Sequence, residues 1–220
     1  MQSPRPARVP VVPLGAALLA LLVLLIPLSS ESLSVVVTRA AMRAGFGVPG
    51  ATVISDLALL LLAVGTAASL AWAWIRRPAT RVVLAAAALG VGIAYVLSES
   101  AKLVFQQLRP CGRWEGVGSC ELADYSFPSN HATLAFGAVF VIALAVGGFW
   151  ATAGALVVAL LTAVGRLLEG AHYLHDVAAG AVLGTAVPAL LVGAVLLIAR
   201  RRQRKDPLRM EGVCRGDGGI

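Results

Sequence analysis

Long apolar runs make up most of the chain, and short polar segments separate them. A helix of about 20 mostly uncharged residues crosses the hydrocarbon of a bilayer, which is about 30 Å thick. Six runs come near that length: 11–30, 53–75, 82–98, 132–148, 150–168 and 177–199. Pro27 and Pro188 fall inside two of these runs, which neighbouring helices can tolerate in a bundle. The pattern predicts an all-α protein built as a six-transmembrane-helix bundle.

The composition agrees with a membrane location. Hydrophobic residues make up 59% of the 220 residues, charged residues only 13%, and the mean hydropathy is +0.86. A soluble domain of this size could not bury so much apolar surface in one core. We expect one membrane domain over residues 11–199, between an N-terminal tail at 1–10 and a basic tail at 200–220.

The basic residues indicate a topology. They form no stripe interleaved with aromatic residues, which argues against a nucleic-acid partner. Six of the 18 Lys and Arg residues lie between Arg200 and Arg209, directly after the last apolar run, as in a stop-transfer segment. Six spans would then place both termini in the cytoplasm and the loops at 31–52, 99–131 and 169–176 outside. The first run could instead be a cleaved signal peptide, but its length and the lack of a clear small-x-small cleavage site favour an uncleaved helix.

Two of the three cysteines lie in the predicted outer loop. Cys111 and Cys120 are nine residues apart, whereas Cys214 lies in the basic tail. An oxidising exterior permits a disulfide between the first two, which would restrain Arg113 and Trp114. Two free thiols are the alternative, and the sequence does not decide between them.

The segment "GRLLEGAHYLHD", residues 165–176, concentrates ionisable groups beside apolar runs. His172 and Asp176 are four residues apart, so on a helix they share a face. Such a carboxylate fixes the imidazole tautomer and leaves the other ring nitrogen free to attack an electrophile. Gly170 offers a helix break that would let Arg166 turn toward the imidazole. A planar guanidinium beside a nucleophilic histidine suits a phosphoryl group.

Two further polar segments have a related character. In "FPSNHATLAF", residues 127–136, Ser129 or Asn130 is expected to cap a helix whose first N–H groups could hold a phosphate oxygen. His131 in the first turn could protonate a leaving oxygen. In "KLVFQQLRP", residues 102–110, Lys102 and Arg109 would lie on one helical face about 10 Å apart, with Pro110 ending the helix. The interval 101–130 is also the longest polar one, where function often resides.

The same ionisable residues could have a purely structural or a metal-binding role. Arg166 with Glu169, and His172 with Asp176, could simply be ion pairs within the bundle. A metal site would draw its ligands from His131, His172, His175 and Asp176. Three nearby cations would repel a divalent ion, and the spacing matches no strong metal signature.

The order Lys-x6-Arg-Pro, Pro-Ser-x-His and Arg-x5-His-x3-Asp resembles the three-part signature of the type 2 phosphatidic acid phosphatase superfamily of lipid phosphatases, over roughly residues 50–200. The resemblance implies a six-helix bundle with its site at one membrane face and no metal or other cofactor. It also implies a general acid at His131 and a nucleophile at His172 oriented by Asp176. The phosphate-binding residues it implies are Lys102, Arg109, Ser129 and Arg166.

This chain departs from the family pattern at two positions. The family usually has glycine where Asn130 stands, and Asn tolerates positive φ well enough to preserve a turn there. Its side chain could narrow the pocket or add a donor to the phosphate site. Gly165 replaces the usual serine, so any hydroxyl contact at that position is lost.

We therefore expect a metal-independent lipid phosphatase of a bacterial cell membrane, with its site facing outward and a phosphohistidine intermediate. The favoured substrate is an isoprenoid pyrophosphate such as undecaprenyl pyrophosphate. Phosphatidylglycerophosphate, phosphatidic acid and a prenyl-linked sugar phosphate are the alternatives. A non-enzymatic transporter or binder of anionic lipids would also use a cationic pocket, but it would not need His172 paired with Asp176. The sequence does not indicate an oligomeric state.

Overall fold

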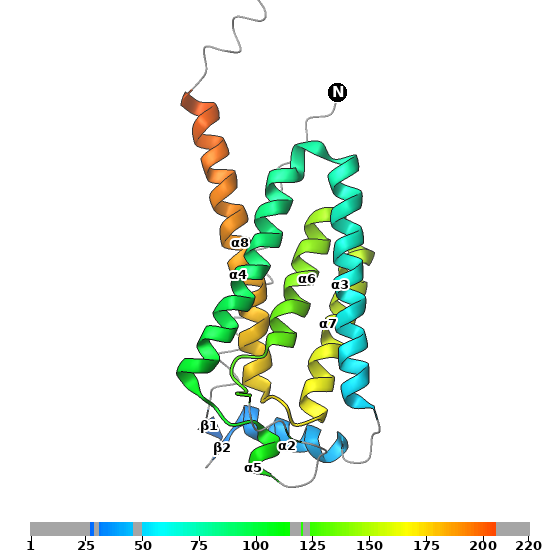
Figure 1. Cartoon of the computed structure of the whole chain (residues 1–220), viewed down its shortest axis with the longest axis vertical. Helices are drawn as coiled ribbons and strands as arrows, with labels where there is room; N and C mark the ends of the chain where they lie inside the picture. Colours follow the sequence, from blue (N-terminus) through cyan, green and yellow to red (C-terminus); the bar gives the residue numbers. More distant parts are fainter. Residues whose placement is uncertain (1–26, 29–30, 46–49, 115–119, 121–123, 206–220) are drawn as a thin grey trace, which may run out of the picture.

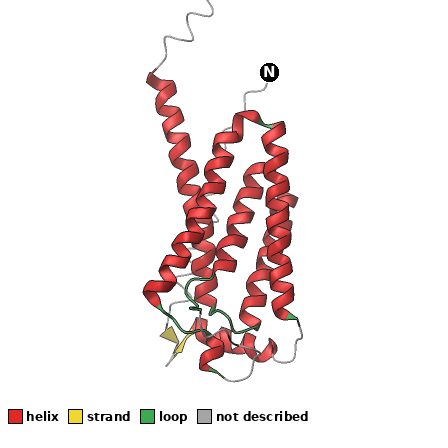
Figure 2. Cartoon of the chain, in the orientation of Figure 1, coloured by secondary structure: helices red, strands yellow, loops and turns green. Residues whose placement is uncertain are grey.

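A computed structural model describes residues 27–28, 31–45, 50–114, 120 and 124–205. Long helices run side by side along the molecule, and most of the shorter elements lie at one of its ends (Figure 1, Figure 2). The long helices are α3 (Ala51–Arg76), α4 (Arg81–Phe105), α6 (Asn130–Val146), α7 (Phe149–Leu168) and α8 (Leu174–Lys205). The short elements are β1 (Pro27–Leu28), β2 (Glu31–Ser32), α2 (Leu33–Gly45), the 3-10 helix η1 (Pro78–Thr80) and α5 (Pro110–Arg113).

Five of the six predicted spans coincide with the five long helices, within a few residues at most ends. The largest differences are at α4 and α8, which continue to Phe105 and Lys205. Within the described part of the chain, four helical segments are long and apolar enough to cross a membrane. These are Val53–Arg76, Pro78–Arg113, Phe149–Leu168 and Leu174–Arg202, and α6 is a shorter apolar helix.

The outer faces of the bundle are apolar, as lipid contact requires. On α4, Val82, Leu89 and Val96 recur every seven residues and are 67%, 61% and 60% exposed. On α3, Leu57, Leu60 and Leu61 are similarly exposed. Such large exposed apolar faces are rare on soluble proteins and indicate a membrane or partner surface. Together with the span lengths, they identify an integral membrane protein.

One N-terminal expectation lies almost entirely outside the described residues, and another differs from the structure. The predicted first span, 11–30, lies outside the described residues except for Pro27 and Leu28, which form a strand paired with β2. The interval 31–52 was expected to be a loop, but 33–45 form helix α2. This helix is amphipathic: Ser34, Thr38 and Met42 recur every four residues on its buried face. At 13 residues it is too short to cross a bilayer, and it lies at one end of the bundle (Figure 1).

Helix α6 lies at the centre of the bundle. Its apolar residues are buried against neighbouring helices on several sides. Ala135 and Ile142 pack with Leu62 of α3 and Ala159 of α7. Phe140 and Val141 pack on another side with Ala87 of α4 and Val192 of α8.

Small residues on α8 allow a close approach to the beginning of α6. A Cβ atom on Gly180 would overlap the carbonyl oxygen of Ser129, and one on Gly184 would overlap the carbonyl oxygen of Thr133. A pair of small residues four apart is a common way for membrane helices to pack closely. The main chains then meet directly, and Ser129 N donates to Asp176 O at 3.1 Å. This contact fixes the N-terminus of α6 against the N-terminus of α8.

Candidate active site

The expected site residues all lie at the end of the bundle that carries α2 and α5 (Figure 1). Lys102 is in the last turn of α4, and Arg109 directly precedes α5. Ser129 caps α6, and Arg166 is in the last turn of α7. His172 follows in the turn between α7 and α8, and Asp176 is in the first turn of α8. The opposite end carries η1 and the C-terminal end of α8.

His172 is almost completely buried, with 2% of its surface exposed. Its Nδ1 lies 2.7 Å from the carbonyl oxygen of Ser126 and 3.8 Å from Oδ2 of Asp176. A carbonyl oxygen only accepts, so Nδ1 carries the hydrogen and, in the neutral ring, Nε2 keeps its lone pair. Burial, together with the charge of Arg166, lowers the pKa of His172 although Asp176 and Ser126 favour the charged form. The ring is therefore neutral at pH 7, with its nucleophilic nitrogen on the side away from Ser126.

Asp176 is fully buried, and both of its carboxylate oxygens accept hydrogen bonds. One oxygen accepts from the backbone N of Tyr173 at 2.7 Å. The other lies 3.1 Å from Nε2 of His175 and accepts from Gln107 Nε2 at 3.2 Å. His175 is itself held by Ser34 of α2, whose hydroxyl lies 2.8 Å from Nδ1. The carboxylate behind the His172 ring therefore belongs to a network that extends to α2.

The turn between α7 and α8 brings Arg166 beside His172. Helix α7 ends at Leu168, and Gly170 adopts φ +67°, a conformation that favours glycine. The backbone N of His172 then donates to the carbonyl of Arg166 at 3.3 Å. The expected break at Gly170 is confirmed.

The Arg166 guanidinium is 8% exposed and faces two carboxylates. Its Nη1 lies 2.9 Å from Glu169 and 4.0 Å from Oδ1 of Asp56 on α3. The expected pairing with Glu169 is present. Nε of Arg166 is buried and makes no hydrogen bond to the described residues. Nη1 faces the two carboxylates, whereas the N–H group at Nε is a further donor that a ligand could use.

Lys102 and Arg109 converge, but not as two turns of one helix. Helix α4 ends at Phe105, and Gln106 follows in a left-handed conformation, so the expectation of a shared helical face was wrong. Pro110 starts α5 and does not end α4. Both cations instead meet on Asp124, with Lys102 Nζ at 3.0 Å and Arg109 Nη2 at 2.6 Å from Oδ2.

Asp124 holds these two cations as an internal anion. Its partial burial would raise its pKa, but the hydrogen bonds and charges of Lys102 and Arg109 outweigh this effect and lower it. The carboxylate is therefore ionised at pH 7 and 40% exposed. A bound phosphate would have to share or displace this contact.

The beginning of α6 is as expected from its sequence. Ser129 is the N-cap, and its side chain accepts from the backbone N of Ala132. His131 is in the first turn, where its Nε2 lies 3.1 Å from Oδ1 of Asp56. The first N–H groups of a helix lack partners within the helix, so this terminus can accept an anion.

Asn130 is the first residue of α6 and does not adopt a positive φ; within the described chain, Gln106 is the one non-glycine residue that does. Its side chain is directed to α4, where its amide nitrogen donates to Glu99 and its oxygen accepts from Ser98 at 2.7 Å. Glu99 also lies 3.4 Å from Lys102. Asn130 therefore connects the N-terminus of α6 to α4.

A disulfide joins Cys111 and Cys120, whose Cα atoms are 5.7 Å apart. The backbone N of Cys111 donates to the carbonyl of Gly170 at 2.9 Å, so α5 is attached to the turn that carries His172. Trp114 lies edge-on to Tyr173, at 5.8 Å between ring centroids. Cys120 is therefore joined to a short helix that is itself bonded to the turn carrying His172.

The metal alternative would draw its ligands from His131, His172, His175 and Asp176. In the described residues, no group of three or more His, Cys, Asp or Glu side chains is placed to hold a metal ion. His172 Nδ1 is bonded to the Ser126 carbonyl, and Asp176 accepts from Tyr173 N and Gln107 Nε2.

Comparison with known proteins identifies the family. The family model described as PAP2 superfamily matches residues 82–200, which include all three motifs. The chain belongs to the PAP2 superfamily. The solved structure of a transmembrane PAP2-type phosphatidylglycerolphosphate phosphatase from Bacillus subtilis has the same fold, with a TM-score of 0.59 at 21% identity over 84% of this chain and 96% of that one.

Two curated relatives match shorter stretches. A probable lipid phosphate phosphatase beta from Arabidopsis thaliana is 33% identical over 114 residues, covering 38% of this chain and 52% of the relative. The bacitracin transport permease protein BcrC from Bacillus licheniformis is 44% identical over 64 residues, covering 28% of this chain and 29% of the relative. The matched part thus spans about half of one relative and less than a third of the other.

Sequence reasoning missed several residues that contact the PAP2 motifs. Ser126 and Gln107 hold His172 and Asp176, Asp56 contacts His131, and Asp124 binds both cations of the first motif. Asp124 lies in the long polar interval 101–130, which is a weak signal. No sequence signal pointed to Asp56. It is 75 residues from His131 in the sequence, and only the packing of α3 brings the two side chains together.

Proposed function

We propose that this PAP2 protein is a membrane lipid phosphatase that removes a terminal phosphate or pyrophosphate group through a phosphohistidine at His172. The observation that carries the proposal is the 2.7 Å contact from His172 Nδ1 to the Ser126 carbonyl, in a buried site beside Arg166. It leaves the Nε2 lone pair available and the ring fixed. A histidine that served only as an ion-pair partner would not need one nitrogen held in this way.

The reaction proceeds in two steps. His172 Nε2 attacks phosphorus, the bond from phosphorus to the leaving oxygen breaks, and His131 gives its proton to that oxygen. Lys102, Arg109, Arg166 and the N-terminus of α6 stabilise the charge on the remaining phosphoryl oxygens. A water molecule then gives a proton to His131 and attacks phosphorus, and the bond to Nε2 breaks. Phosphate leaves, and both histidines return to their starting states.

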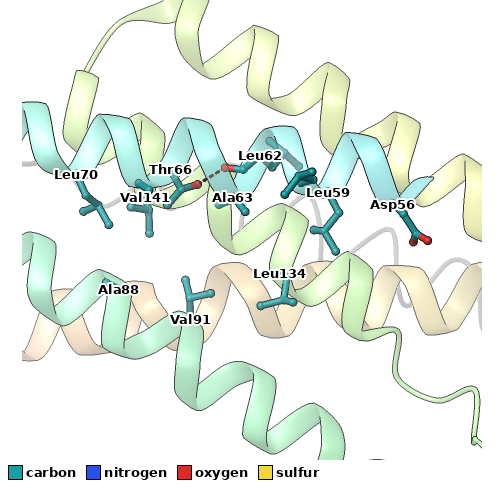
Figure 3. A pocket seen from close by; sticks show the side chains of 13 residues that line it. Asp56, Leu59, Leu62, Ala63, Thr66, Leu70, Ala88, Val91, Leu134 and Val141 are labelled. Atoms are coloured by element: carbon teal, nitrogen blue, oxygen red, sulfur yellow. Dashed lines mark hydrogen bonds between the residues drawn. The ribbon is translucent and has the colours of Figure 1, made fainter. Parts of the chain in front are cut away.

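An apolar groove beside the site supports a lipid substrate. It lies between α3, α4 and α6 and has a volume of about 570 Å³. Leu59, Ala63, Val91 and Leu134 are among the residues that line it, and Asp56 lies at one end (Figure 3). Because Asp56 also contacts His131, the groove opens next to the proposed acid. We assign the groove to the hydrocarbon chain of the substrate, with the phosphate at the Asp56 end.

An isoprenoid pyrophosphate such as undecaprenyl pyrophosphate is our favoured substrate. Three cations and a helix N-terminus suit a highly charged head group, and the groove suits a long hydrocarbon chain. The names of the relatives point to lipid phosphates more broadly, including phosphatidylglycerolphosphate in the Bacillus subtilis protein. Phosphatidylglycerophosphate, phosphatidic acid and prenyl sugar phosphates are therefore the competing substrates.

The site is proposed to face outward. Arg76, Arg77 and Arg81 flank the turn between α3 and α4, and Arg200 follows at the same end, opposite the site. Basic residues favour the cytoplasmic side of a membrane. With Cys111 and Cys120 paired, Cys214 is the remaining cysteine. A membrane-impermeant maleimide should label it in permeabilised but not in intact cells, and labelling of intact cells would reverse the orientation.

Phosphate release by the full-length protein in detergent tests the function directly. The panel is undecaprenyl pyrophosphate, phosphatidylglycerophosphate and phosphatidic acid, each with EDTA and with or without vanadate. We expect release from at least one lipid in EDTA, inhibition by vanadate, and the highest kcat/KM for the isoprenoid. Binding of these lipids without release would indicate a carrier, and activity lost in EDTA but restored by a divalent metal would contradict the metal-independent mechanism.

A further inference from the structure

Asp56 lies outside the three PAP2 motifs but inside the proposed site. It is in the first turns of α3, 57% exposed, and its Oδ1 lies 3.1 Å from Nε2 of His131 and 4.0 Å from Nη1 of Arg166. The same carboxylate forms the polar end of the apolar groove (Figure 3). Asp56 is thus placed between the acid, a phosphate-binding cation and the proposed position of the lipid chain.

A buried hydrogen bond next to Asp56 holds this part of α3 at the site. The neighbouring Ser55 is completely buried, and its hydroxyl donates to the carbonyl of Thr162 on α7 at 3.2 Å. This bond anchors the beginning of α3 to the helix that carries Arg166, four residues beyond Thr162. The carboxylate of Asp56 is therefore held at the site although the side chain itself is open to solvent.

The contact determines where His131 carries its hydrogen. A carboxylate oxygen only accepts, so Nε2 of His131 must be the donor in this pair. Arg166 contacts the same oxygen of Asp56. Burial and the charge of Arg166 disfavour a positive charge on His131, whereas the carboxylate of Asp56 favours it. Nε2 therefore carries a hydrogen in both the neutral and the positively charged ring. The charged ring is the acid: it gives the Nε2 hydrogen to the leaving oxygen and becomes neutral.

We propose that Asp56 is the positioning residue for His131: it keeps the hydrogen on Nε2 in the resting protein and gives way to the leaving oxygen of the lipid phosphate. This role rests on the proposed phosphatase function. Asp56 itself forms no bond to phosphorus and exchanges no proton with the substrate. When the phosphate enters from the groove, Nε2–H exchanges its carboxylate acceptor for the leaving oxygen.

Activity measurements on the full-length protein test the role. Asp56→Asn should lower kcat by about tenfold or more, since positioned acids contribute about 10² to 10⁴ in rate, and should leave KM nearly unchanged. Asp56→Glu should recover part of kcat. Ser100→Ala, which removes an exposed hydroxyl that donates to the Val96 carbonyl on α4, is the control and should match the wild type. In a His131→Ala background, Asp56→Asn should cause no further loss; an equal loss in both backgrounds would overturn the proposal.

A second measurement does not depend on catalysis. The chain has three histidines, so ¹⁵N-histidine labelling gives a small set of imidazole signals, and those of His131 are identified by their absence in His131→Gln. The wild type should show a protonated Nε2 at His131, and Asp56→Asn should lose this preference. An unchanged spectrum would refute the role of Asp56 even if the protein is an active phosphatase. The expected spectral change in a protein that releases no phosphate would instead refute the phosphatase function while retaining the Asp56–His131 contact.

Discussion

His172 is 2% exposed and held by the Ser126 carbonyl with Asp176 behind it, whereas His131 is 26% exposed and contacts the solvent-exposed Asp56. The difference matches two chemical roles. A nucleophile that must form a bond to phosphorus benefits from a fixed ring with one free lone pair. A group that gives a proton to a leaving oxygen and takes one from water must remain accessible and must be able to change partners. The site therefore combines a fixed half, made of His172 with Ser126 and Asp176, and an exchangeable half, made of His131 with Asp56.

Removing the ring of the fixed half should have the largest effect. His172→Ala deletes the proposed nucleophile and should reduce phosphate release by on the order of 10⁴-fold or more. The lipid should still bind, because the cations remain, and a vesicle or detergent binding assay checks this. Substantial turnover by this variant would show that the buried histidine is not the nucleophile.

Changing the exchangeable half should matter less and should depend on the leaving group. His131→Ala should slow hydrolysis of a lipid phosphate by about 10² to 10⁴-fold. p-Nitrophenolate leaves from p-nitrophenyl phosphate without a proton, so its release in the first turnover should fall much less. First-turnover rates for the two substrates in the variant and the wild type provide the measurement. Equal losses on both would remove the assignment of His131 as the acid.

Asp176→Asn probes how the fixed half is held. The Ser126 carbonyl already keeps the hydrogen on Nδ1 of His172, so the tautomer should survive the change. The loss should come from weaker stabilisation of the positive ring and from disturbance of the bonds to His175 and Tyr173. We expect about a 10- to 100-fold lower kcat, smaller than in His172→Ala. Steady-state kinetics check this, and a loss as large as that of His172→Ala would indicate that Asp176 controls the tautomer.

A change in the groove should affect only substrates with a long chain. Ala63→Phe should raise KM for a long-chain lipid phosphate several-fold and leave a short-chain, water-soluble phosphate unaffected, because it fills space that the chain would occupy. Ala68→Phe is the matched control, since Ala68 lies on the same helix, is exposed and does not line the groove. Identical effects of the two variants would place the hydrocarbon chain elsewhere.

The parts predicted from sequence are those that local physics determines. The apolar runs predicted the five long helices, Gly170 was identified as a break, and the cap was narrowed to Ser129 or Asn130, of which the structure has Ser129. Helix α2 was missed because its buried face carries Ser34 and Thr38, which interrupt an apolar pattern, and because 13 residues cannot span a bilayer. The geometry of Lys102 and Arg109 was wrong because the chain leaves the helix at Gln106, which lacks the usual glycine or proline signal.

Contacts between distant segments account for the residues that the sequence did not reveal. Ser126 acts through its backbone carbonyl, so its side-chain type carries no information about the contact with His172. Asp56 reaches His131 because a buried hydrogen bond from Ser55 joins α3 to α7. Asp124 contacts Lys102 and Arg109, which are 22 and 15 residues earlier in the sequence, so local sequence pattern does not reveal these pairs. The roles assigned to the site residues, the domain limits and the orientation in the membrane stay predictions.

Trapping the covalent intermediate is the most direct test of the central claim. The full-length protein is mixed with its lipid substrate carrying ³²P in the transferred phosphate and quenched in alkali within milliseconds, and the labelled peptide is identified by mass spectrometry. The account predicts acid-labile, alkali-stable phosphate on His172, absent from His172→Ala and increased in His131→Ala with an aryl phosphate because hydrolysis lacks its base. Phosphate on another residue, or full turnover with no labelled protein at any quench time, would contradict it.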